Sequence, residues 1–342
     1  MCQTVSVLLP VWNEQRYLSD VLTSFLQQDY PLEKIELVVA EGNSTDATPQ
    51  ILADCQRDHP ELTLKIVANP LRNTAIGRNL CLQHSTGTLV LNFSGHGIAA
   101  PNLLSVLTEK MAHEPEDVAG VGCAIEVPES TTFIERALGV VLASPLGGRD
   151  RVDSNFSPQQ EQYTRSTAFT LYRRPVLDLL EGFDPEFWCG QDAELNLRLR
   201  QAGYRILYTP DTRVYHYKRS SFSAFVLQMY RYGVARAKLI KKHPDARRMV
   251  FLLPSLFVIC VGVALAASFF SQLALIGTAA AAVLFAMVSF WSAAAAKGTW
   301  LGIAVSPLLY ASLYAAYGCG FAAGWLYHHR AREPSTSRLR GA

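Results

Sequence analysis

The chain lacks charge along one long stretch. Among its 342 residues, the only charged side chain between Met249 and Tyr327 is Lys297. A soluble domain rarely leaves so many residues without surface charge, because exposed apolar surface is unfavourable in water. At about 20 residues per crossing, this region of residues 250–327 is long enough for several membrane spans. We predict three of them, over residues 250–270, 273–293 and 299–326.

Paired cysteines are also missing. The chain has seven cysteines, an odd number, and none stands in a C-x-x-C pair. This argues against a disulfide framework and a zinc site, and favours a reducing compartment. Val5 begins a predicted strand with no basic flank before it, so we expect no signal peptide. We therefore expect a multi-pass protein of the inner, cytoplasmic membrane whose front part stays in the cytoplasm.

No excess of one charge sign marks the front part. Beyond Met249 lie five basic residues and one acid, which leaves 26 basic and 28 acidic residues before it. Roughly 245 residues fit one ordinary soluble domain. Its nearly balanced charge excludes nucleic acid as the expected partner.

What the front part does contain is an alternation of strand and helix patterns. Apolar runs rich in β-branched residues predict strands over 4–12, 35–42, 64–70 and 88–93, and helical spacing predicts helices between them over 17–28, 44–58 and 75–84. This order predicts an α/β fold with a parallel sheet covered on both faces. Right-handed crossovers then bring four polar loops to one sheet edge, as in a nucleotide pocket. These loops are 10–14, 41–46, 69–73 and 94–96.

The second half of the front part is less regular. Its pattern predicts a strand over 167–172, helices over 174–181 and 192–202, and a strand over 205–208. Residues 131–152 are rich in small side chains and contain Gly147-Gly148, so we expect a mobile loop there.

Residues 220–248 predict a basic amphipathic helix directly before the first span. Apolar residues such as Phe225 and Met229 recur at helical spacing, and Arg231 and Lys238 lie on the polar face. Such a helix suits the negatively charged cytoplasmic leaflet. A plain surface helix of the soluble domain is the alternative. The basic pair at 247–248 places the start of the first span on the cytoplasmic side.

The pattern leaves the topology of the tail open. Three crossings would place the basic polar tail, residues 328–342, outside, against the positive-inside rule. Residues 299–326 would otherwise be re-entrant, or split near Pro307. Gly320 and Gly324 form a G-x-x-x-G pair, a spacing that lets helices pack closely.

Six segments occur in an order that resembles a known family. They are SVLLPVWNE, VVAEGNSTDAT, NPLRNTAIGRN, the strand leading into FSGHG, GFDPEFWCGQDAELNLRLRQAG and QMYRYG. Together they resemble family-2 inverting glycosyltransferases, above all the membrane-anchored subgroup that builds succinoglycan-type exopolysaccharides on lipid carriers. The resemblance implies a Rossmann-like GT-A domain, here residues 1–219, followed by a helical transmembrane region. It also implies a nucleotide-sugar donor such as a UDP-hexose, a divalent metal (Mn²⁺ or Mg²⁺), inversion at the anomeric carbon and a lipid-linked polyprenyl-diphosphate acceptor.

Glycosyl transfer first requires that the nucleoside be held. The resemblance places Glu41 where the family has an aspartate that contacts the nucleobase, and a longer carboxylate still accepts from a base N–H. Asp46 would steady the same turn or cap the following helix. Pro10 and Glu14 border the pocket.

The reaction also requires a base for the acceptor hydroxyl. Asp192 in GQDAEL matches the catalytic base of the family, and the dipole of the helix that it begins favours an ionised carboxylate. The family has Glu-Asp where this chain has Gln191-Asp192. A plain helix cap is the alternative role.

Finally, the diphosphate leaving group must be neutralised. The resemblance places the metal-binding D-x-D element on Ser94-Gly95-His96, so His96 remains as a metal ligand and Ser94 replaces an acid. His216 matches a downstream histidine that faces the diphosphate, and two histidines favour Mn²⁺ over Mg²⁺. A turn residue and a surface histidine are the alternatives for this pair. Further cations predicted to carry phosphate charge are Arg78, Lys218 and Arg219.

Gln228, Arg231 and Tyr232 resemble the Q-x-x-R-W element that lines the acceptor path of processive polymer synthases. Two or three spans are too few for a polymer channel, so we expect a single sugar addition to a lipid-linked acceptor. Transfer to polyprenyl phosphate itself is one alternative. The other is a catalytically weak relative that only binds a nucleotide sugar, a role favoured by Ser94, Glu41 and Gln191.

Overall fold

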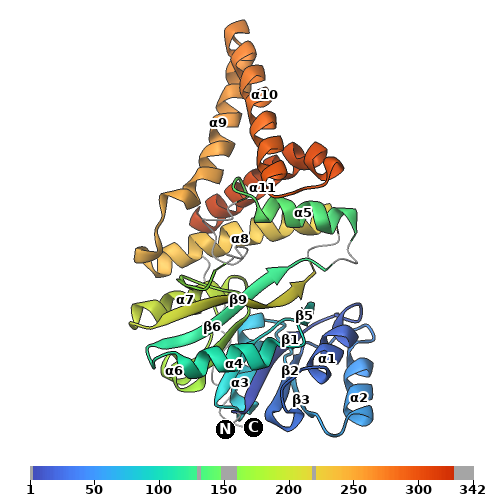
Figure 1. The fold of residues 1–342 in the computed structure, drawn as a ribbon. Helices are drawn as coiled ribbons and strands as arrows, with labels where there is room; N and C mark the ends of the chain where they lie inside the picture. The colour runs from blue at the N-terminus through green and yellow to red at the C-terminus, as the bar shows by residue number, and fades with distance from the viewer. Residues whose placement is uncertain (1–2, 129–131, 148–159, 218–220, 327–342) are drawn as a thin grey trace.

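The structure is a computed structural model that describes residues 3–128, 132–147, 160–217 and 221–326. An α/β domain forms one end of the molecule, and three helices lie across it: α5 (Phe133–Ala143), α8 (Phe222–Lys242) and α11 (Trp300–Leu326). From this layer a hairpin of α9 (Leu253–Ser268) and α10 (Gln272–Ala295) extends away from the α/β domain (Figure 1).

The sheet begins with the predicted parallel block. Its strands are β1 (Val5–Val11), β2 (Ile35–Glu41), β3 (Thr63–Ala68) and β4 (Leu89–Asn92), in the order β3-β2-β1-β4. The predicted α/β fold and parallel pairing of these strands are confirmed. Because all four run the same way, the loops that follow them lie at one edge of the sheet.

Strands of both directions then extend the sheet beyond β4: β8 is antiparallel to β4 and β6, whereas β6 and β9 pair in parallel. The order continues β4-β8-β6-β9-β5, and β7 pairs with β9 at the side. β8 (Thr170–Arg173) is antiparallel to β4, and β5 (Gly97–Ala99) is antiparallel to β9 (Arg205–His216). The other two strands are β6 (Val118–Glu126) and β7 (Gln162–Thr164).

Helices cover both faces of the sheet, and each face has its own core. Val7 and Leu9 of β1 pack into one cluster, whereas Leu8 packs into the other. Strands buried on both faces read as continuous apolar runs, which is why the sequence pattern found them. The helices of the α/β domain are α1 (Leu18–Leu26), α2 (Thr48–Asp58), α3 (Thr74–His84), α4 (Leu103–His113), α6 (Arg174–Leu179) and α7 (Gln191–Gln201).

Residues 131–152, expected to hold a mobile loop, instead contain α5. Thr132 caps this helix: its hydroxyl accepts from the backbone N–H of Glu135, and the Glu135 carboxylate accepts in return from the Thr132 N–H at 2.7 Å. Leu138 and Val141 are buried and pack in a cluster with residues of α8 and α11. The small-residue pattern did not reveal this helix, and a mobile loop elsewhere within 131–152 stays a prediction. Residues 148–152 lie outside the described part.

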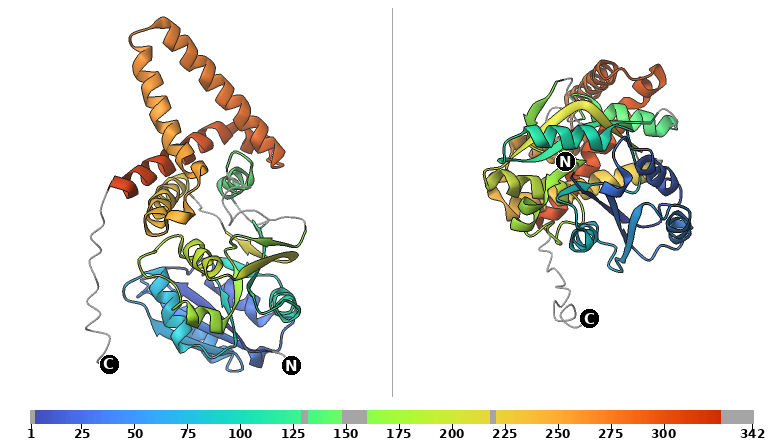
Figure 2. Two further views of the ribbon diagram at one scale, coloured as in Figure 1. Left: turned by 90° about the vertical axis from the view of Figure 1, so that its left-hand side faces the viewer. Right: turned by 60° about the horizontal axis from the view of Figure 1, so that its bottom comes forward.

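The C-terminal helices include three that are long and apolar enough to cross a membrane. In the described part these are 249–268, 272–295 and 300–326. The 249–268 helix joins a short 3₁₀ turn, η3 (Met249–Leu252), to α9. Figure 2 shows α9 and α10 standing upright while α11 runs across their base.

The predicted close approach at Gly320 and Gly324 is present, and the partner is α8. A Cβ on Gly320 would collide with the carbonyl oxygen of Tyr230, and one on Gly324 would lie 2.9 Å from the Cα of Val234. From the other side, a Cβ on Gly233 would collide with the carbonyl oxygen of Tyr317. The α8 and α11 backbones are therefore in direct contact.

Candidate active site

Hydrogen bonds join the loops after β1 and β2 at the sheet edge. The Asn13 N–H donates to the Ser44 hydroxyl at 2.9 Å, and the Thr45 N–H donates to the Asn13 side chain at 2.8 Å. The Glu14 N–H donates to the Thr48 hydroxyl at 2.9 Å. The Asn13 backbone has a φ of 53°, a left-handed conformation that asparagine tolerates. The two loops therefore form one rigid wall.

Glu41 and Asp46 belong to this wall. Each Glu41 oxygen accepts one backbone N–H of its own turn, from Asn43 at 3.0 Å and from Ser44 at 2.7 Å. Asp46 accepts from the N–H of Thr48 at 3.0 Å and of Gln15 at 3.1 Å. Desolvation alone would raise the pKa of Asp46, but these hydrogen bonds lower it overall. Asp46 thus ties the β1 loop to the start of α2.

Glu14, His96 and His216 form a second group. His96 Nδ1 lies 3.0 Å from a Glu14 carboxylate oxygen, and the two histidine rings lie 4.9 Å apart between centroids. Strand pairing explains their approach, because Gly97 of β5 is opposite His216 of β9. A Cβ on Gly95 would lie 2.9 Å from the Glu14 side chain, so glycine allows Glu14 to reach His96.

Arg78 and Asp192 form a third group. Arg78, on α3, is only 8 % exposed, and its guanidinium stands 5.2 Å from the Phe183 ring centroid. Burial lowers the pKa of Arg78, and the Asp192 charge acts in the opposite direction. Burial likewise raises the pKa of Tyr172 far above its ordinary value, and Asp192 raises it further. The Asp192 charge therefore acts on the pKa of both side chains.

Several buried polar atoms at this edge have no hydrogen-bond partner. Within the described residues, five buried side-chain atoms lack one: Asn69 Oδ1, Arg78 Nε, Arg78 Nη1, Asn92 Oδ1 and Ser94 Oγ. Asn69 directly follows β3, Asn92 ends β4, and Ser94 lies two residues later. The Asn69 amide also lies beside the start of α3, because a Cβ on Gly77 would be 2.7 Å from it and 3.1 Å from Pro10 Cβ. Buried polar atoms are nearly always paired, so this concentration makes the edge the candidate for a ligand site.

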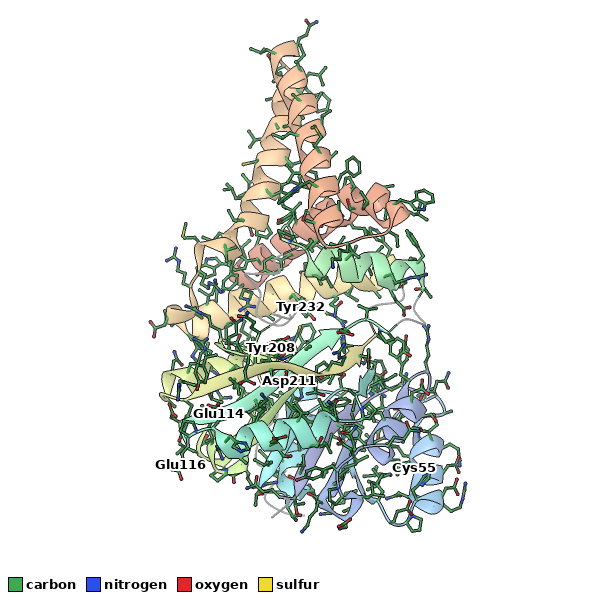
Figure 3. The ribbon with its side chains drawn as sticks, viewed as in Figure 1. Cys55, Glu114, Glu116, Tyr208, Asp211 and Tyr232 are labelled. Carbon is green, nitrogen blue, oxygen red and sulfur yellow. The ribbon has the colours of Figure 1, made fainter. Side chains whose placement is uncertain are left out.

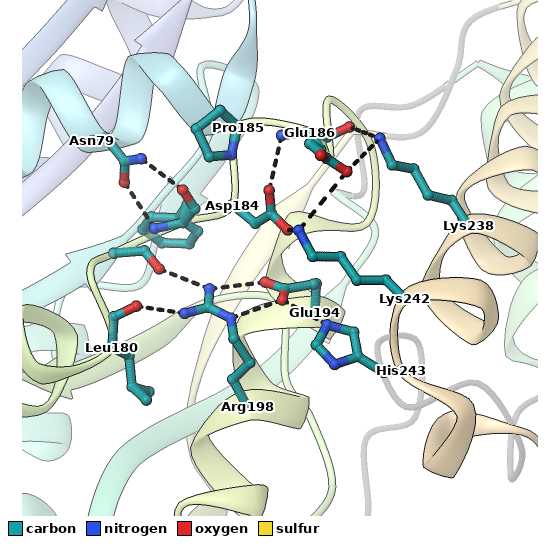
Figure 4. Close-up of polar contacts among 12 residues, drawn as sticks. Asn79, Leu180, Asp184, Pro185, Glu186, Glu194, Arg198, Lys238, Lys242 and His243 are labelled. Atoms are coloured by element: carbon teal, nitrogen blue, oxygen red, sulfur yellow. Dashed lines mark hydrogen bonds and ion pairs between the residues drawn. The ribbon is translucent and has the colours of Figure 1, made fainter. Parts of the chain in front are cut away.

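The loop before Asp192 is held against α8 (Figure 4). Lys242 of α8 bonds Asp184 at 2.5 Å, and Lys238 pairs with Glu186 at 3.3 Å. At the end of α8, His243 Nε2 lies 3.1 Å from the fully buried Glu194, which Arg198 also pairs at 2.7 Å. Asp184 and Arg198 of the predicted motif thus hold the loop before Asp192 in place.

The predicted acceptor residues lie on α8. The Gln228 amide donates to the Tyr232 hydroxyl at 3.1 Å, and Arg231 stands over the Trp188 ring at 5.3 Å. Trp188 is four residues before Asp192. A Cβ added to Gly190, just before α7, would lie 3.6 Å from the Cβ of Ala235 on α8. Figure 3 shows Tyr232 on α8, between the helical layer and the sheet, far from Cys55 on α2. The acceptor residues therefore adjoin the loop that carries Asp192.

The predicted metal site is incomplete in the described residues. They contain no group of three His, Cys, Asp or Glu side chains placed to hold an ion. Ser94 brings no charge, and the one carboxylate near the histidines, Glu14, is bonded to His96. The residues present do not fit a divalent ion held by protein ligands alone. The dependence on Mn²⁺ or Mg²⁺ stays a prediction.

Two predicted site residues are not described by the structure, and two residues of the site were not predicted. Lys218 and Arg219 lie outside the described residues. Asn69 and Asn92 were not predicted as site residues, although both are polar groups at the ends of buried strands. Their position at the carboxyl ends of neighbouring parallel strands, rather than any motif, is the feature that would have identified them.

The sequence model of glycosyltransferase like family 2 matches residues 3–235, more than half of the chain. A Methanococcus voltae protein is 29% identical over 243 residues, which cover 70% of this chain and 74% of the relative. Its name is dolichyl N-acetyl-alpha-D-glucosaminyl phosphate 3-beta-D-2,3-diacetamido-2,3-dideoxy-beta-D-glucuronosyltransferase. The succinoglycan biosynthesis protein ExoA of Rhizobium meliloti is 24% identical over 247 residues, covering 71% of this chain and 73% of the relative.

A solved structure extends the likeness to the helical part. The mannosyltransferase PcManGT from Pyrobaculum calidifontis, in complex with GDP-Man and Mn²⁺, superposes with a TM-score of 0.60 and 21% identity. The match covers 96% of this chain and 88% of that one, and it supports the same GT-A-like fold with C-terminal helices. The family match and the fold agree: this chain belongs to glycosyltransferase family 2.

Proposed function

We propose that the chain is a membrane-bound inverting glycosyltransferase. It transfers one sugar from a nucleotide-sugar donor, a UDP-hexose, to a lipid-linked acceptor in polysaccharide biosynthesis. The catalytic domain, residues 1–219, works on the cytoplasmic side of the membrane. Asp192 acts as the general base.

One observation carries this proposal: the buried, unpartnered polar atoms lie at the edge where the polar loops meet. Two guanidinium nitrogens of Arg78 and the Ser94 hydroxyl are buried there without a hydrogen-bond partner. A donor diphosphate would supply acceptors for both side chains. Buried donors without an acceptor are costly, so an anionic ligand would offset that cost.

The base is suited to its role by its position. Asp192 stands in the first turn of α7, directly after the loop that packs on α8. In the described residues its carboxylate accepts one hydrogen bond, from the adjacent Ala193 N–H at 2.9 Å. The acceptor hydroxyl transfers its proton to Asp192 as its oxygen attacks the anomeric carbon. The nucleoside diphosphate leaves from the opposite face, and this single displacement inverts the configuration.

The loop wall offers a place for the nucleoside. Pro10 and Gly77 bring β1 and α3 close together, and Glu41 ends β2 at the same edge. A carboxylate has about four lone-pair sites, so the two N–H groups that Glu41 accepts leave further acceptor capacity for a base N–H. We assign Glu41 this contact and Asp46 the support of its turn.

Two features favour a lipid-linked acceptor. The helix beside the Asp192 loop, α8, also packs against α11, one of the helices apolar enough for a membrane. Beyond the end of α8 lies an apolar groove of about 320 Å³. Its lining includes Ile240, Phe321 and Trp325, with Arg247 and Arg248 beside them. Such a groove suits an isoprenoid chain whose diphosphate meets the arginines.

The experiment uses the purified full chain in lipid nanodiscs. UDP-, GDP- and dTDP-hexoses are each tested with a polyprenyl-diphospho-sugar, with polyprenyl phosphate and with no acceptor. We expect nucleoside diphosphate release to rise only with a UDP-hexose and the lipid-diphospho-sugar, and the product to have the opposite anomeric configuration by NMR.

Each other outcome overturns a stated part of the proposal. Transfer to polyprenyl phosphate alone would make that lipid the acceptor. Donor binding without release above the acceptor-free control, for every pair, would leave a nucleotide-sugar-binding relative. A product that retains the anomeric configuration would contradict the single displacement.

A further inference from the structure

We propose that α11 does not cross the bilayer. It lies flat at the membrane surface on the side of the catalytic domain, and the α9–α10 hairpin alone spans the membrane, out and back. This goes beyond the length and composition of the three helices, which admit three crossings, and it does not depend on catalysis.

Both ends of α11 are attached to helices that belong to the catalytic side. Next to its first turn, a Cβ on Gly298 would lie 3.0 Å from Val140 of α5. At its last turn, Lys241 of α8 donates to the carbonyl oxygens of Gly324, at 3.1 Å, and Trp325. At 1.5 Å per residue α11 is about 40 Å long. If it stood upright across a core about 30 Å thick, its two ends would face opposite sides.

The helices that hold α11 are themselves fixed to the α/β domain. Glu135 of α5 lies 3.9 Å from Arg16 and 3.5 Å from the hydroxyl of Tyr17, in and next to the loop that follows β1. α8 is joined to the Asp192 loop through Lys238 and Lys242. Both contact points are therefore on the same side of the bilayer.

The two faces of α11 differ in what they touch. The buried face packs on α5 and α8: the Tyr310 hydroxyl lies 2.6 Å from that of Ser144, just after α5, and Gly320 packs on Tyr230 of α8. The exposed face is an apolar stripe with one interruption, at the half-buried Ala311 and Ser312. Its residues are Leu301, Ala304, Leu308, Ala315, Cys319, Ala322 and Leu326. A helix that is apolar all round needs a cover on every side, and here protein covers one face and leaves the other for lipid.

The α9–α10 hairpin differs from α11, because other parts of the described protein cover almost none of its surface. Only 11% of the 249–268 window and 6% of the α10 window are buried, against 39% for α11. The 20 and 24 residues of the two arms correspond to about 30 and 36 Å, enough for one crossing each. At the tip, Phe269 and Phe270 are 87% and 90% exposed.

Two crossings also remove the conflict with the charge rule. Arg247 and Arg248 precede α9, Lys297 follows α10, and four arginines lie between residues 330 and 340. With a two-span hairpin and a flat α11, all of these basic residues leave the membrane on the side of the catalytic domain, as the positive-inside rule requires. A third crossing would place the last four arginines opposite the others.

The test measures depth along α11 in the full chain reconstituted in vesicles. Cys260 and Cys319 are replaced by alanine, and spin labels are attached at Leu301→Cys, Leu308→Cys or Leu326→Cys, which share one helix face. Val283→Cys, at the middle of α10, is the matched control. We expect the three α11 labels to report one shallow depth by oxygen and nickel accessibility, and the Val283 label to lie near the bilayer centre. A deep label at 308 between shallow ones at 301 and 326 overturns the proposal.

A second measurement tests the hairpin. Ser271→Cys is exposed at the tip, and a membrane-impermeant maleimide should label it only from the side opposite the N-terminus. A fluorescent protein fused after Ala342 should be found on the same side of the membrane as the N-terminus. Labelling of the tip from the N-terminal side, no labelling from either side, or a C-terminus on the far side each contradicts the two-span topology. None of these readouts needs enzyme activity, so their failure would leave the proposed reaction standing.

Discussion

At the scale of single residues, the site is defined by polar groups that the fold buries without satisfying. Arg78 is the clearest case, because two nitrogens of its buried guanidinium have no hydrogen-bond partner. Burial lowers its pKa overall although the Asp192 charge acts in the opposite direction. Unpartnered buried donors destabilise an empty site, which is why we propose that they serve a ligand.

Arg78→Met is expected to separate stability from binding. The substitution removes a buried charge that Asp192 offsets only in part, and methionine keeps a side chain of similar length. The melting temperature should therefore equal or exceed that of the wild type. Affinity for a nucleoside diphosphate should fall at least tenfold, about 1.4 kcal/mol. Calorimetry and thermal unfolding measure the two effects. A lower melting temperature with unchanged affinity would show that Arg78 serves the fold rather than the ligand.

Ser94→Asp is expected to complete the metal site. A carboxylate beside His96 and His216 adds the charged oxygen ligand that hard divalent cations prefer. Calorimetry with Mn²⁺ alone should show binding to the variant and none to the wild type. Ser94→Ala is the matched control and should resemble the wild type. Equal Mn²⁺ affinity in all three proteins would show that residue 94 does not face the metal position.

The sequence identifies some site residues better than others. Asp192, Ser94 and His96 stand in motifs whose spacing can be read directly. Asn69 and Asn92 belong to no motif, and an asparagine at a strand end reads as an ordinary turn residue. Their role appears only when the sheet places both at the same buried edge.

At the scale of elements, α8 shows what periodicity leaves out. The spacing predicts an amphipathic helix with a basic face toward lipid headgroups. In the structure, Lys238 and Lys242 instead bond the loop before α7, and Lys241 bonds the end of α11. A helical pattern shows which residues share a face, but it does not show which partner covers that face.

Gly320→Ala tests the contact between α8 and α11. The added methyl group would collide with the Tyr230 backbone, which cannot move as a side chain can. We expect a loss of about 1–3 kcal/mol in the free energy of unfolding, as for overpacked cores. Gly277→Ala in α10 is the control, because a Cβ there meets nothing within 4 Å. Thermal unfolding in nanodiscs measures both, and equal melting temperatures would contradict the contact.

At the scale of the whole molecule, the all-parallel half of the sheet was predictable and the mixed half was not. β1 to β4 are apolar runs with helices between them, so local pattern and short crossovers determine their order. β6 and β5 pair with strands distant in sequence, and glycines interrupt the β6 run. Such pairings depend on the whole chain, and a local pattern does not specify them.

The structure links the C-terminal helices to the start of α7. α11 packs on α8, and α8 bonds the loop that leads to Asp192. In the proposed arrangement, with the hairpin and α11 in contact with lipid and Asp192 as the base, this packing fixes the height of the base above the bilayer. A lipid-linked acceptor would thus meet the base at the membrane surface.

The most direct test of the account is Asp192→Asn in the full chain, with Asp178→Asn as a matched control on an exposed turn of α6. We expect kcat for sugar transfer to fall by about 10²–10⁴, the usual contribution of a general base. Affinity for the nucleotide should change less than about threefold, well below a tenfold change of 1.4 kcal/mol. The Asp178 variant should match the wild type in both. Turnover of the Asp192 variant at the wild-type rate would contradict the central claim.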